Sequence, residues 1–297
     1  MGDSKTFSVN SRIKEIIIET QLREIRLSAS DDENYALDYD DRDDLYSTEY
    51  SVEDGVIHLH QEFKKRNFLF HPISHVDPIY VKVPTTFDGK VTLVTSNAGI
   101  ESKIKNLVEE GKFKTTNAGI NVNDLKAKKS LSIQTSNATV EVEDLTVKEG
   151  TIEVVTTNAR IIAKEILGKD LSFTTKNGDC NITDCESIRA FRVTTSNSSI
   201  NIDHSQAKAF ELKTSNARIH VDNAKAERYD VVSSNANVTL LLDGKASEYD
   251  FTGITSNGQV EFGNVKVSKE LRVPVDSSTK RIAIKTSNAS ISATFIE

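Results

Sequence analysis

Apolar and polar residues alternate along most of this chain with a period of two. Around Asn137, for example, Leu131 and Ile133 precede the asparagine and Val140 follows it, with polar residues interleaved. Alternation of this period is typical of β-strands that bury one face. No segment between these strands shows the spacing of an amphipathic helix. The pattern therefore predicts an all-β chain of short strands.

The alternating pattern recurs at a nearly constant interval, marked each time by a Thr-Ser-Asn-Ala-like motif. Successive motif asparagines are separated by 20, 20, 21, 19, 20, 19, 19, 22 and 31 residues. Two residues before the asparagine stands Thr, or Ser233 in one copy, and the residue after it is always Ala, Gly or Ser. The ten motif asparagines are Asn97, Asn117, Asn137, Asn158, Asn177, Asn197, Asn216, Asn235, Asn257 and Asn288.

The apolar phase shifts by one residue across each motif, which indicates a corner where the chain turns and the inward face is re-established. Asparagine suits a corner because it tolerates the left-handed backbone region and bonds within turns. One coil of about twenty residues cannot bury its apolar face alone, but stacked coils can. We therefore predict a β-solenoid, a β-helix-like stack with coils about 4.8 Å apart. The asparagines would form a structural ladder of amides bonded from coil to coil. A meandering antiparallel stack is the alternative.

The chain divides by motif content into two parts. Residues 1–85 lack the motif but contain strand-like segments, and we predict that they form an N-terminal β cap, because a solenoid end exposes unpaired backbone. Residues 86–297 hold the repeat region of about ten coils, with an irregular connection at 263–281. An uncovered coil at either end would favour pairing with a second copy, and the oligomeric state is left open.

Charge and composition narrow the partners. The chain has 37 basic and 44 acidic side chains, for a net charge of −7, and a phosphate-binding surface needs a basic excess, so nucleic acid is excluded as the main partner. No apolar run approaches the ~18 residues that span a bilayer, and no secretory signal is expected at the start. We expect a location in the cytoplasm or at the inner membrane face, with the cell surface, reached without a signal peptide, as the alternative.

Two motifs carry a resemblance to a known family. A strand-rich lead ends in Val81-Lys82-Val83-Pro84, and repeats such as Thr95-Ser96-Asn97-Ala98-Gly99-Ile100 follow. This arrangement resembles a bacterial β-strand-repeat family, a domain of unknown function commonly labelled "putative adhesin", from about residue 12 to the end. The resemblance implies an all-β stacked fold without known catalytic residues. Some relatives in that family resemble proteins linked to cell-envelope stress responses.

One basic and aromatic patch interrupts the lead segment. Its members are Lys64, Lys65, Arg66, Phe68 and Phe70. Such a patch is typical of a peripheral membrane contact or a partner-docking element. Packing of the phenylalanines under the cap would explain the same residues. We treat it as the candidate contact patch.

Cation and metal sites have simpler alternatives. The acidic run Asp38–Asp44 is oxygen-rich, as calcium loops are, but it lacks the glycine and terminal glutamate of a helix-loop-helix calcium site, so a solvated loop is favoured. His58 and His60 share one strand face near His71 and His75, where two pairs could meet at a metal; surface histidines explain the pattern equally. We predict no metal and no cofactor.

The two cysteines stand where another coil carries core aliphatics. Cys180 and Cys185 correspond to Val140 and Leu145 in the coil of Asn137. Buried cysteine behaves as a small apolar side chain, and two cysteines are too few for a disulfide scaffold. We therefore expect inert core residues, with a disulfide or redox pair as the alternative.

Enzymatic activity is not predicted. A carbohydrate-active solenoid enzyme needs an acid–base pair that breaks the repeat. The repeat is most broken at residues 176–179 and 263–281, and neither segment holds such a pair. We predict a non-enzymatic interaction or scaffold protein of adhesin-like type, linked to the bacterial cell envelope, with a protein or an envelope glycan as partner. A carbohydrate-binding module or a carbohydrate-active β-helix enzyme is the alternative.

Overall fold

The computed structural model describes residues 3–9, 12–31, 34–41, 45–64 and 77–296. Within these residues the only helical segment is the three-residue 3-10 turn Ala246–Glu248, and no membrane-spanning helix is found. The chain divides into two compact units, unit 1 (Met1–Val147) and unit 2 (Lys148–Glu297). Each unit is described by itself.

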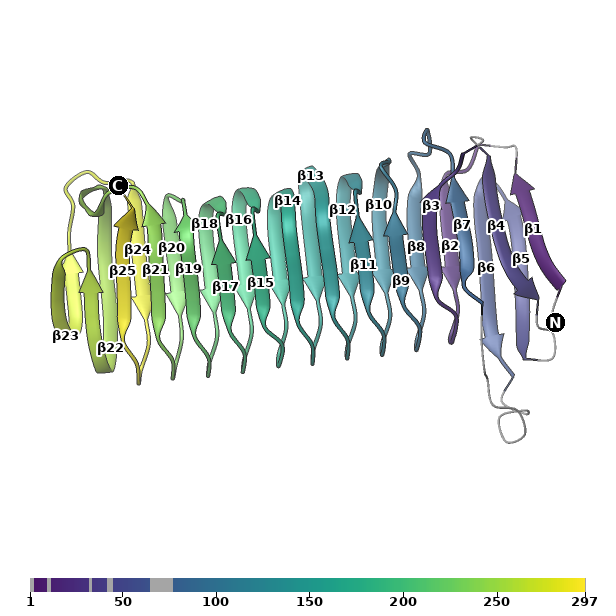
Figure 1. Ribbon diagram of the computed structural model, residues 1–297. Coiled ribbons are helices and arrows are strands. Elements are labelled where there is room, and N and C mark those ends of the chain that lie inside the picture. Colours follow the sequence, from purple (N-terminus) through teal and green to yellow (C-terminus); the bar gives the residue numbers. More distant parts are fainter. Residues whose placement is uncertain (1–2, 10–11, 32–33, 42–44, 65–76, 297) are drawn as a thin grey trace. The chain divides into compact units, whose positions relative to one another are not determined.

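Unit 1 contains parallel strands with antiparallel strands at one end (Figure 1). Its elements are β1 (Asp3–Val9), β2 (Glu15–Glu19), β3 (Ile25–Ala29), β4 (Tyr35–Asp41), β5 (Tyr46–Glu53), β6 (Val56–Phe63), β7 (Ile79–Val83), β8 (Lys90–Val94), β9 (Ile100–Lys103), β10 (Leu107–Lys114), β11 (Ile120–Asn123), β12 (Lys126–Gln134) and the first part of β13 (Val140–Val155).

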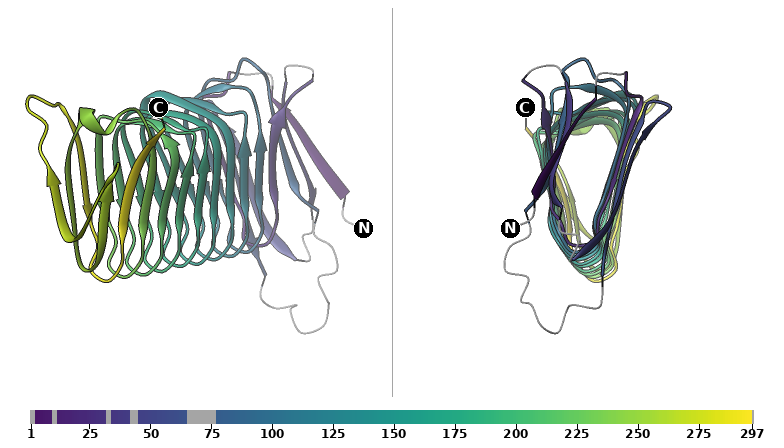
Figure 2. Two further views of the ribbon diagram at one scale, coloured as in Figure 1. Left: turned by 60° about the vertical axis from the view of Figure 1, so that its left-hand side comes forward. Right: turned by 90° about the vertical axis from the view of Figure 1, so that its right-hand side faces the viewer.

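Each coil of unit 1 gives one strand to each of two parallel ladders, which face each other across the interior (Figure 2). In one ladder β10 lies between β8 and β12, so that Phe113 aligns with Leu93 and Ile133. In the other ladder β11 lies between β9 and β13. Like residues therefore stack on like. This arrangement confirms the predicted solenoid-like stack and excludes an antiparallel meander for these coils.

The first coil of the chain does not lie at the end of the stack. Strand β2 pairs in parallel with both β6 and β8, and β3 pairs with both β7 and β9. The coil that precedes them in space is therefore built from β6 and β7. Antiparallel strands complete this end, because β5 pairs with β6, β4 with β7 and β1 with β4. These antiparallel strands lie at the edge of the stack in unit 1. The division of the chain at residue 85 into a cap and a repeat region stays a prediction.

Unit 2 continues the coil pattern and closes with an antiparallel hairpin (Figure 1). Its elements are the second part of β13, then β14 (Ile161–Thr174), β15 (Cys180–Thr183), β16 (Glu186–Thr194), β17 (Ile200–Asp203), β18 (Gln206–Lys213), β19 (Ile219–Ala224), β20 (Arg228–Val232), β21 (Val238–Asp243), the 3-10 turn, β22 (Tyr249–Phe262), β23 (Val265–Val273), β24 (Lys280–Lys285) and β25 (Ile291–Ile296).

The last coil of unit 2 is also inserted one place inward. Strand β24 lies between β20 and β22, and β25 lies between β21 and β22. The coil of Asn288 therefore separates the coils of Asn235 and Asn257. Strand β23 runs antiparallel to β22 along the terminal coil. The spacing of 31 residues before Asn288 thus contains this closing strand.

Left-handed backbone occurs at a different corner from the one that the sequence suggested. None of the ten motif asparagines has a positive φ. The residue seven positions later does in six coils: the positive-φ residues are Asp124, Asp144, Glu165, Asp184, His204 and Asn223. Asp, Asn and His adopt this conformation at the lowest cost among non-glycine residues. We call this turn the second corner, and the motif asparagines must be explained by something other than φ.

The interior of unit 2 holds a stack of aromatic rings. Phe191 lies 5.7 Å from Phe173 and 4.9 Å from Phe210 between ring centroids. Phe210 lies 5.5 Å from Tyr229, with the rings nearly parallel. All four side chains are fully buried. Phe191, Phe210 and Tyr229 occupy the same position in successive coils, so their ring contacts repeat along the stack. Phe173 belongs to the next inward position, where it aligns with Val193.

Candidate functional site

The motif asparagines form an amide ladder within each unit. In each of the following rungs the Nδ2 of one asparagine donates to the Oδ1 of the asparagine in the adjacent coil. In unit 1 the rungs are Asn117 to Asn97 at 2.6 Å and Asn137 to Asn117 at 2.7 Å. In unit 2 they are Asn177 to Asn158, Asn197 to Asn177, Asn216 to Asn197 and Asn235 to Asn216, each at 2.8 Å, then Asn288 to Asn235 and Asn257 to Asn288, each at 2.7 Å.

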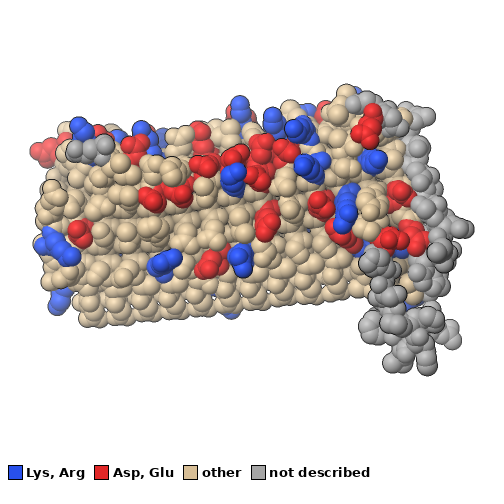
Figure 3. All heavy atoms as spheres, in the orientation of Figure 1, with Lys and Arg blue, Asp and Glu red and all other residues tan. Residues whose placement is uncertain are grey.

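The threonines of the motif also bond between coils. Thr115 Oγ1 donates to the carbonyl of Ala98 at 3.0 Å, and Thr135 Oγ1 donates to that of Ala118 at 3.0 Å. The edge along these corners carries few charged side chains (Figure 3). The bonds between coils give these amides and hydroxyls a structural role, so we look for a binding site elsewhere.

The predicted contact patch falls almost entirely outside the described residues. Lys64 follows β6 and is exposed, and its backbone N–H donates to the carbonyl of Leu45 at 2.8 Å. Lys65, Arg66, Phe68 and Phe70 lie outside the described residues, as do His71 and His75. The patch therefore stays a prediction.

The other predicted sites are placed only in part. Of the acidic run Asp38–Asp44, the side chains of Asp38 and Asp40 are described, at the end of β4. His60 Nδ1 lies 3.3 Å and His58 Nε2 lies 3.7 Å from the same Glu19 carboxylate oxygen. In the part of the chain that the structure describes, no group of three or more His, Cys, Asp or Glu side chains is placed to hold a metal ion.

Both cysteines are buried thiols. Neither Cys180 nor Cys185 forms a disulfide. Burial raises the pKa of each thiol to about 12, because a low-dielectric interior disfavours the thiolate. The reactive form is therefore suppressed at neutral pH.

Unit 2 changes its coil length beside a hollow. Between the pairs Ser187–Ala207 and Ala190–Ala209, two residues of β16 face one residue of β18. On the other side of β16, Gly168 of β14 pairs with Ser187 and Asp170 pairs with Ala190. The same two residues of β16 therefore face a single residue of β14 as well. The extra residue produces a bulge at Ile188 and Arg189. This coil therefore projects beyond both neighbours.

The two bulge residues are both exposed, and they differ in their contacts. The Arg189 guanidinium turns back onto Asp170, with Nε 2.7 Å from Oδ1, and this contact lowers the pKa of the buried Asp170 carboxyl. Ile188 stays 52% exposed. The next two coils, which contain β18 and β20, pair without an extra residue. The outer surface of these two coils is therefore recessed relative to Ile188.

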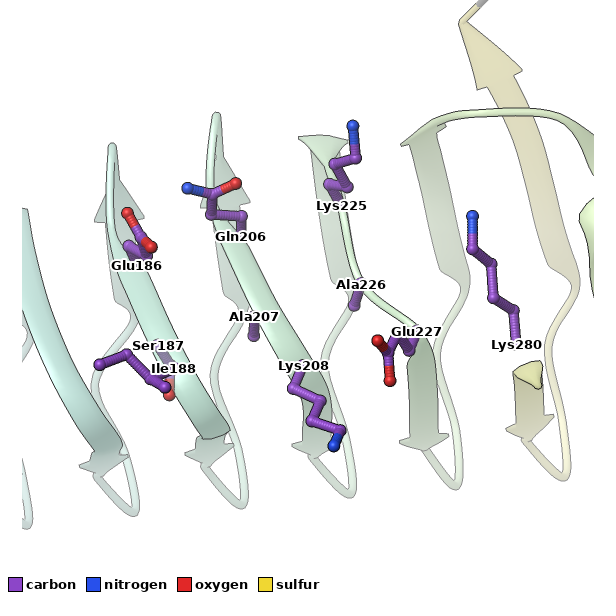
Figure 4. A pocket seen from close by; sticks show the side chains of 10 residues that line it. All are labelled: Glu186, Ser187, Ile188, Gln206, Ala207, Lys208, Lys225, Ala226, Glu227 and Lys280. Carbon is purple, nitrogen blue, oxygen red and sulfur yellow. The ribbon is translucent and has the colours of Figure 1, made fainter.

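This drop creates a groove of about 470 Å³, which we call the alanine-floored groove (Figure 4). Ala207 and Ala226 lie between Ile188 at one end and Lys280 at the other. The lining residues are Glu186, Ser187, Ile188, Gln206, Ala207, Lys208, Lys225, Ala226, Glu227 and Lys280. A second hollow of about 370 Å³ shares Glu186, Gln206 and Lys225 and reaches the second corner.

The rim of the groove carries charges of both signs. Lys225 Nζ lies 3.2 Å from Asp243, and Lys280 Nζ lies 2.5 Å from Glu248. No ion pair within the described residues engages the three remaining charged residues of the lining. These are Glu186, Lys208 and Glu227. The groove thus offers two carboxylates and one ammonium that are not committed to each other.

The backbone beneath the groove is hydrogen-bonded from coil to coil. The N–H groups of Ala207 and Lys225 donate to the carbonyls of Lys225 and Ser205 at 3.0 and 3.1 Å. The N–H of Glu227 donates to the carbonyl of Lys208 at 3.2 Å. A ligand here is therefore held by side chains rather than by strand addition.

The fold and the ladders define the class of this protein, a solenoid-like array of β-strand repeats. A comparison with family models matches residues 13–294 to the Toastrack family, DUF4097, and the chain belongs to that family. The match confirms the resemblance carried by the repeated motif. Among curated proteins, none is similar enough to the chain to count as a match.

Several solved structures resemble the chain. A "putative adhesin" from Bacteroides fragilis has 14% identity and a TM-score of 0.45, over 76% of this chain and 95% of that chain. A "putative adhesin" from Parabacteroides distasonis has 12% identity and a TM-score of 0.36, over 99% and 96%. A "putative lipid binding protein" from Parabacteroides distasonis has 16% identity and a TM-score of 0.33, over 100% and 98%. At these values the resemblance assigns no function to this chain.

Proposed function

We propose that this chain is a non-enzymatic binding protein of adhesin-like type that holds an envelope component in the alanine-floored groove. One observation carries the proposal: the regular coil wall is interrupted where a bulged coil meets shorter ones, and the resulting hollow presents uncommitted charges. Side chains that neither pair with each other nor stabilise the core are available to a ligand. The envelope is proposed as the place of action, with a protein or a glycan as partner.

A catalytic role is less well supported at this site. Asp203, His204 and Ser205 follow one another beside the second hollow, and His204 Nδ1 lies 2.7 Å from Asp203. A nucleophilic serine must be hydrogen-bonded to its base. Instead, Ser205 Oγ donates to the carbonyl of Asp203 at 2.9 Å and accepts from the N–H of Cys185 at 3.2 Å. The hydroxyl therefore holds the second corner in place.

The proposed function can be tested by co-sedimentation of the purified chain with isolated, insoluble bacterial cell wall. Ala207→Leu would fill the floor of the groove. Ala283→Leu is the matched control, because Ala283 is a partly exposed alanine on strand β24 and does not line the groove.

We expect the native chain and Ala283→Leu to sediment with the cell wall and Ala207→Leu to stay in solution. Equal sedimentation of all three proteins would show that the groove is not the binding site. No sedimentation of the native chain would contradict the proposal.

A further inference from the structure

We propose that the ligand of the alanine-floored groove is a neutral, linear oligosaccharide that lies along the stacking direction of the coils. This inference rests on the proposed function, because it names the ligand class for the same groove.

The charges of the groove suit hydroxyl groups. Glu186 and Glu227 are hydrogen-bond acceptors, and Lys208 is a donor. A sugar hydroxyl both donates and accepts, so it can bond to either kind of side chain. Lys225 and Lys280 are already neutralised by Asp243 and Glu248. An anionic ligand would meet the two free carboxylates, and a cationic ligand would meet the lysines, so a neutral ligand fits best.

The backbone and apolar surface argue against two other ligand classes. An extended peptide gains most of its affinity from an unpaired strand edge, and the N–H groups of Ala207, Lys225 and Glu227 are already bonded between coils. An acyl chain needs a continuous apolar wall. Here the apolar side chains are Ile188, Ala207 and Ala226 alone among the lining residues.

The length of the groove points to a chain of sugars rather than one. Four successive coils line it, contributing Ile188, Ala207, Ala226 and Lys280 in that order (Figure 4). With adjacent coils about 4.8 Å apart, the floor extends for roughly 14 Å. The small alanine side chains leave room for the C–H face of a pyranose ring between the charged residues of the rim.

The test is a titration of the ¹⁵N-labelled full-length chain with defined oligosaccharides, followed by backbone amide chemical shifts. The probes are the dimer and tetramer of β-1,4-linked N-acetylglucosamine, the tetramer of β-1,4-linked glucose, an anionic galacturonate tetramer and a cationic glucosamine tetramer. We expect shifts at residues 206–208 and 225–227 with at least one neutral tetramer, weaker binding of the dimer, and none with the charged tetramers.

Two variants make the test specific. Lys208→Gln removes a charged donor and should weaken binding of the neutral tetramer by about tenfold, since a hydrogen bond to a charged group contributes about that much. Ala207→Leu should abolish the shifts, whereas Ala283→Leu should leave them unchanged.

Shifts with a charged tetramer alone, or with no oligosaccharide, would overturn the assigned ligand class. If cell-wall sedimentation still depends on Ala207 in that case, the ligand class is wrong and the proposed function stands. If the native chain does not sediment with the cell wall, or if its sedimentation does not depend on Ala207, the proposed function is wrong.

Discussion

The asparagine ladder predicts a specific pattern of stability losses in unit 2. Asn197 takes part in two rungs, because it donates to Asn177 and accepts from Asn216, each at 2.8 Å. Asn257 is an end member and takes part in one rung, to Asn288 at 2.7 Å. Because neither backbone has a positive φ, alanine can replace each asparagine without backbone strain.

The magnitudes follow from counting rungs. A hydrogen bond contributes about 0.5–1.5 kcal/mol to the free energy of unfolding. Asn197→Ala should therefore cost about 1–3 kcal/mol, and Asn257→Ala about half as much. The double variant of Asn197 and Asn216 loses three rungs, whereas the two single variants together lose four. We expect the double variant to be about 1 kcal/mol more stable than additivity predicts.

The measurement is equilibrium urea unfolding of the full chain, with the same slope required of all variants. The double variant of Asn197 and Asn235 is the matched control, because these residues share no rung and their effects should add. Equal losses for Asn197→Ala and Asn257→Ala would contradict the ladder as a source of stability. Additive effects in the adjacent pair would contradict it as well.

Three further predictions concern side chains of unit 2: a buried aromatic ring, a buried carboxylate with its arginine partner, and the two buried cysteines. Phe210→Ala should lower the free energy of unfolding by about 3–5 kcal/mol, because it leaves a cavity at a fully buried site in the aromatic stack. Urea unfolding measures this loss, and a clearly smaller value would show that neighbouring side chains fill the cavity. Arg189→Ala should lower the melting temperature at pH 7 by leaving the buried Asp170 carboxylate without its partner. The folded pKa of Asp170 is lowered, so this stabilisation is present above the unfolded pKa of about 3.9 and is lost as pH falls through the folded value. Melting curves of the native chain and the variant should therefore converge in acid, and a constant difference would contradict the contact. Cys180 and Cys185 should react with a thiol reagent at pH 8 only when urea unfolds the chain, and rapid labelling of the folded chain would contradict their burial.

The repeat can be predicted from the sequence because it follows from the alternation of inward and outward side chains within each short strand. Inward side chains such as Phe173 and Phe191 must alternate within each strand, and every coil must repeat the pattern of the one beside it. The spacing of the asparagines therefore indicates the stack and places the amides of Asn177 and Asn197 next to each other. The backbone role assigned to asparagine was wrong, because its amide bonds to the next coil and the positive φ belongs to the second corner.

The order of coils at the ends could not be predicted from the motif. The coil of β2 and β3 lies directly beside the coil of Asn97, whose N–H donates to the carbonyl of Gln21 at 2.8 Å. At the asparagine position that coil carries Leu22, so it has no amide to reveal its place in the stack. Insertion of one coil between two others is decided by long-range pairing, which leaves no periodic signal in the chain.

The bulge beside the groove corresponds to a one-residue change in repeat length. The spacing from Asn177 to Asn197 is 20 residues and the next two spacings are 19, and the bulge at Ile188 accounts for the additional residue. The ladder accommodates the additional residue as a bulge between the pairs Ser187–Ala207 and Ala190–Ala209, so that strand pairing continues on both sides of it. This bulge lies between the second corner and the inward residues Phe191 and Val193 of the same strand, so the inward face of the strand is unchanged beyond it. A β-strand-repeat protein is therefore expected to build its binding sites at that position, and small changes in repeat length are the sequence feature by which to find them.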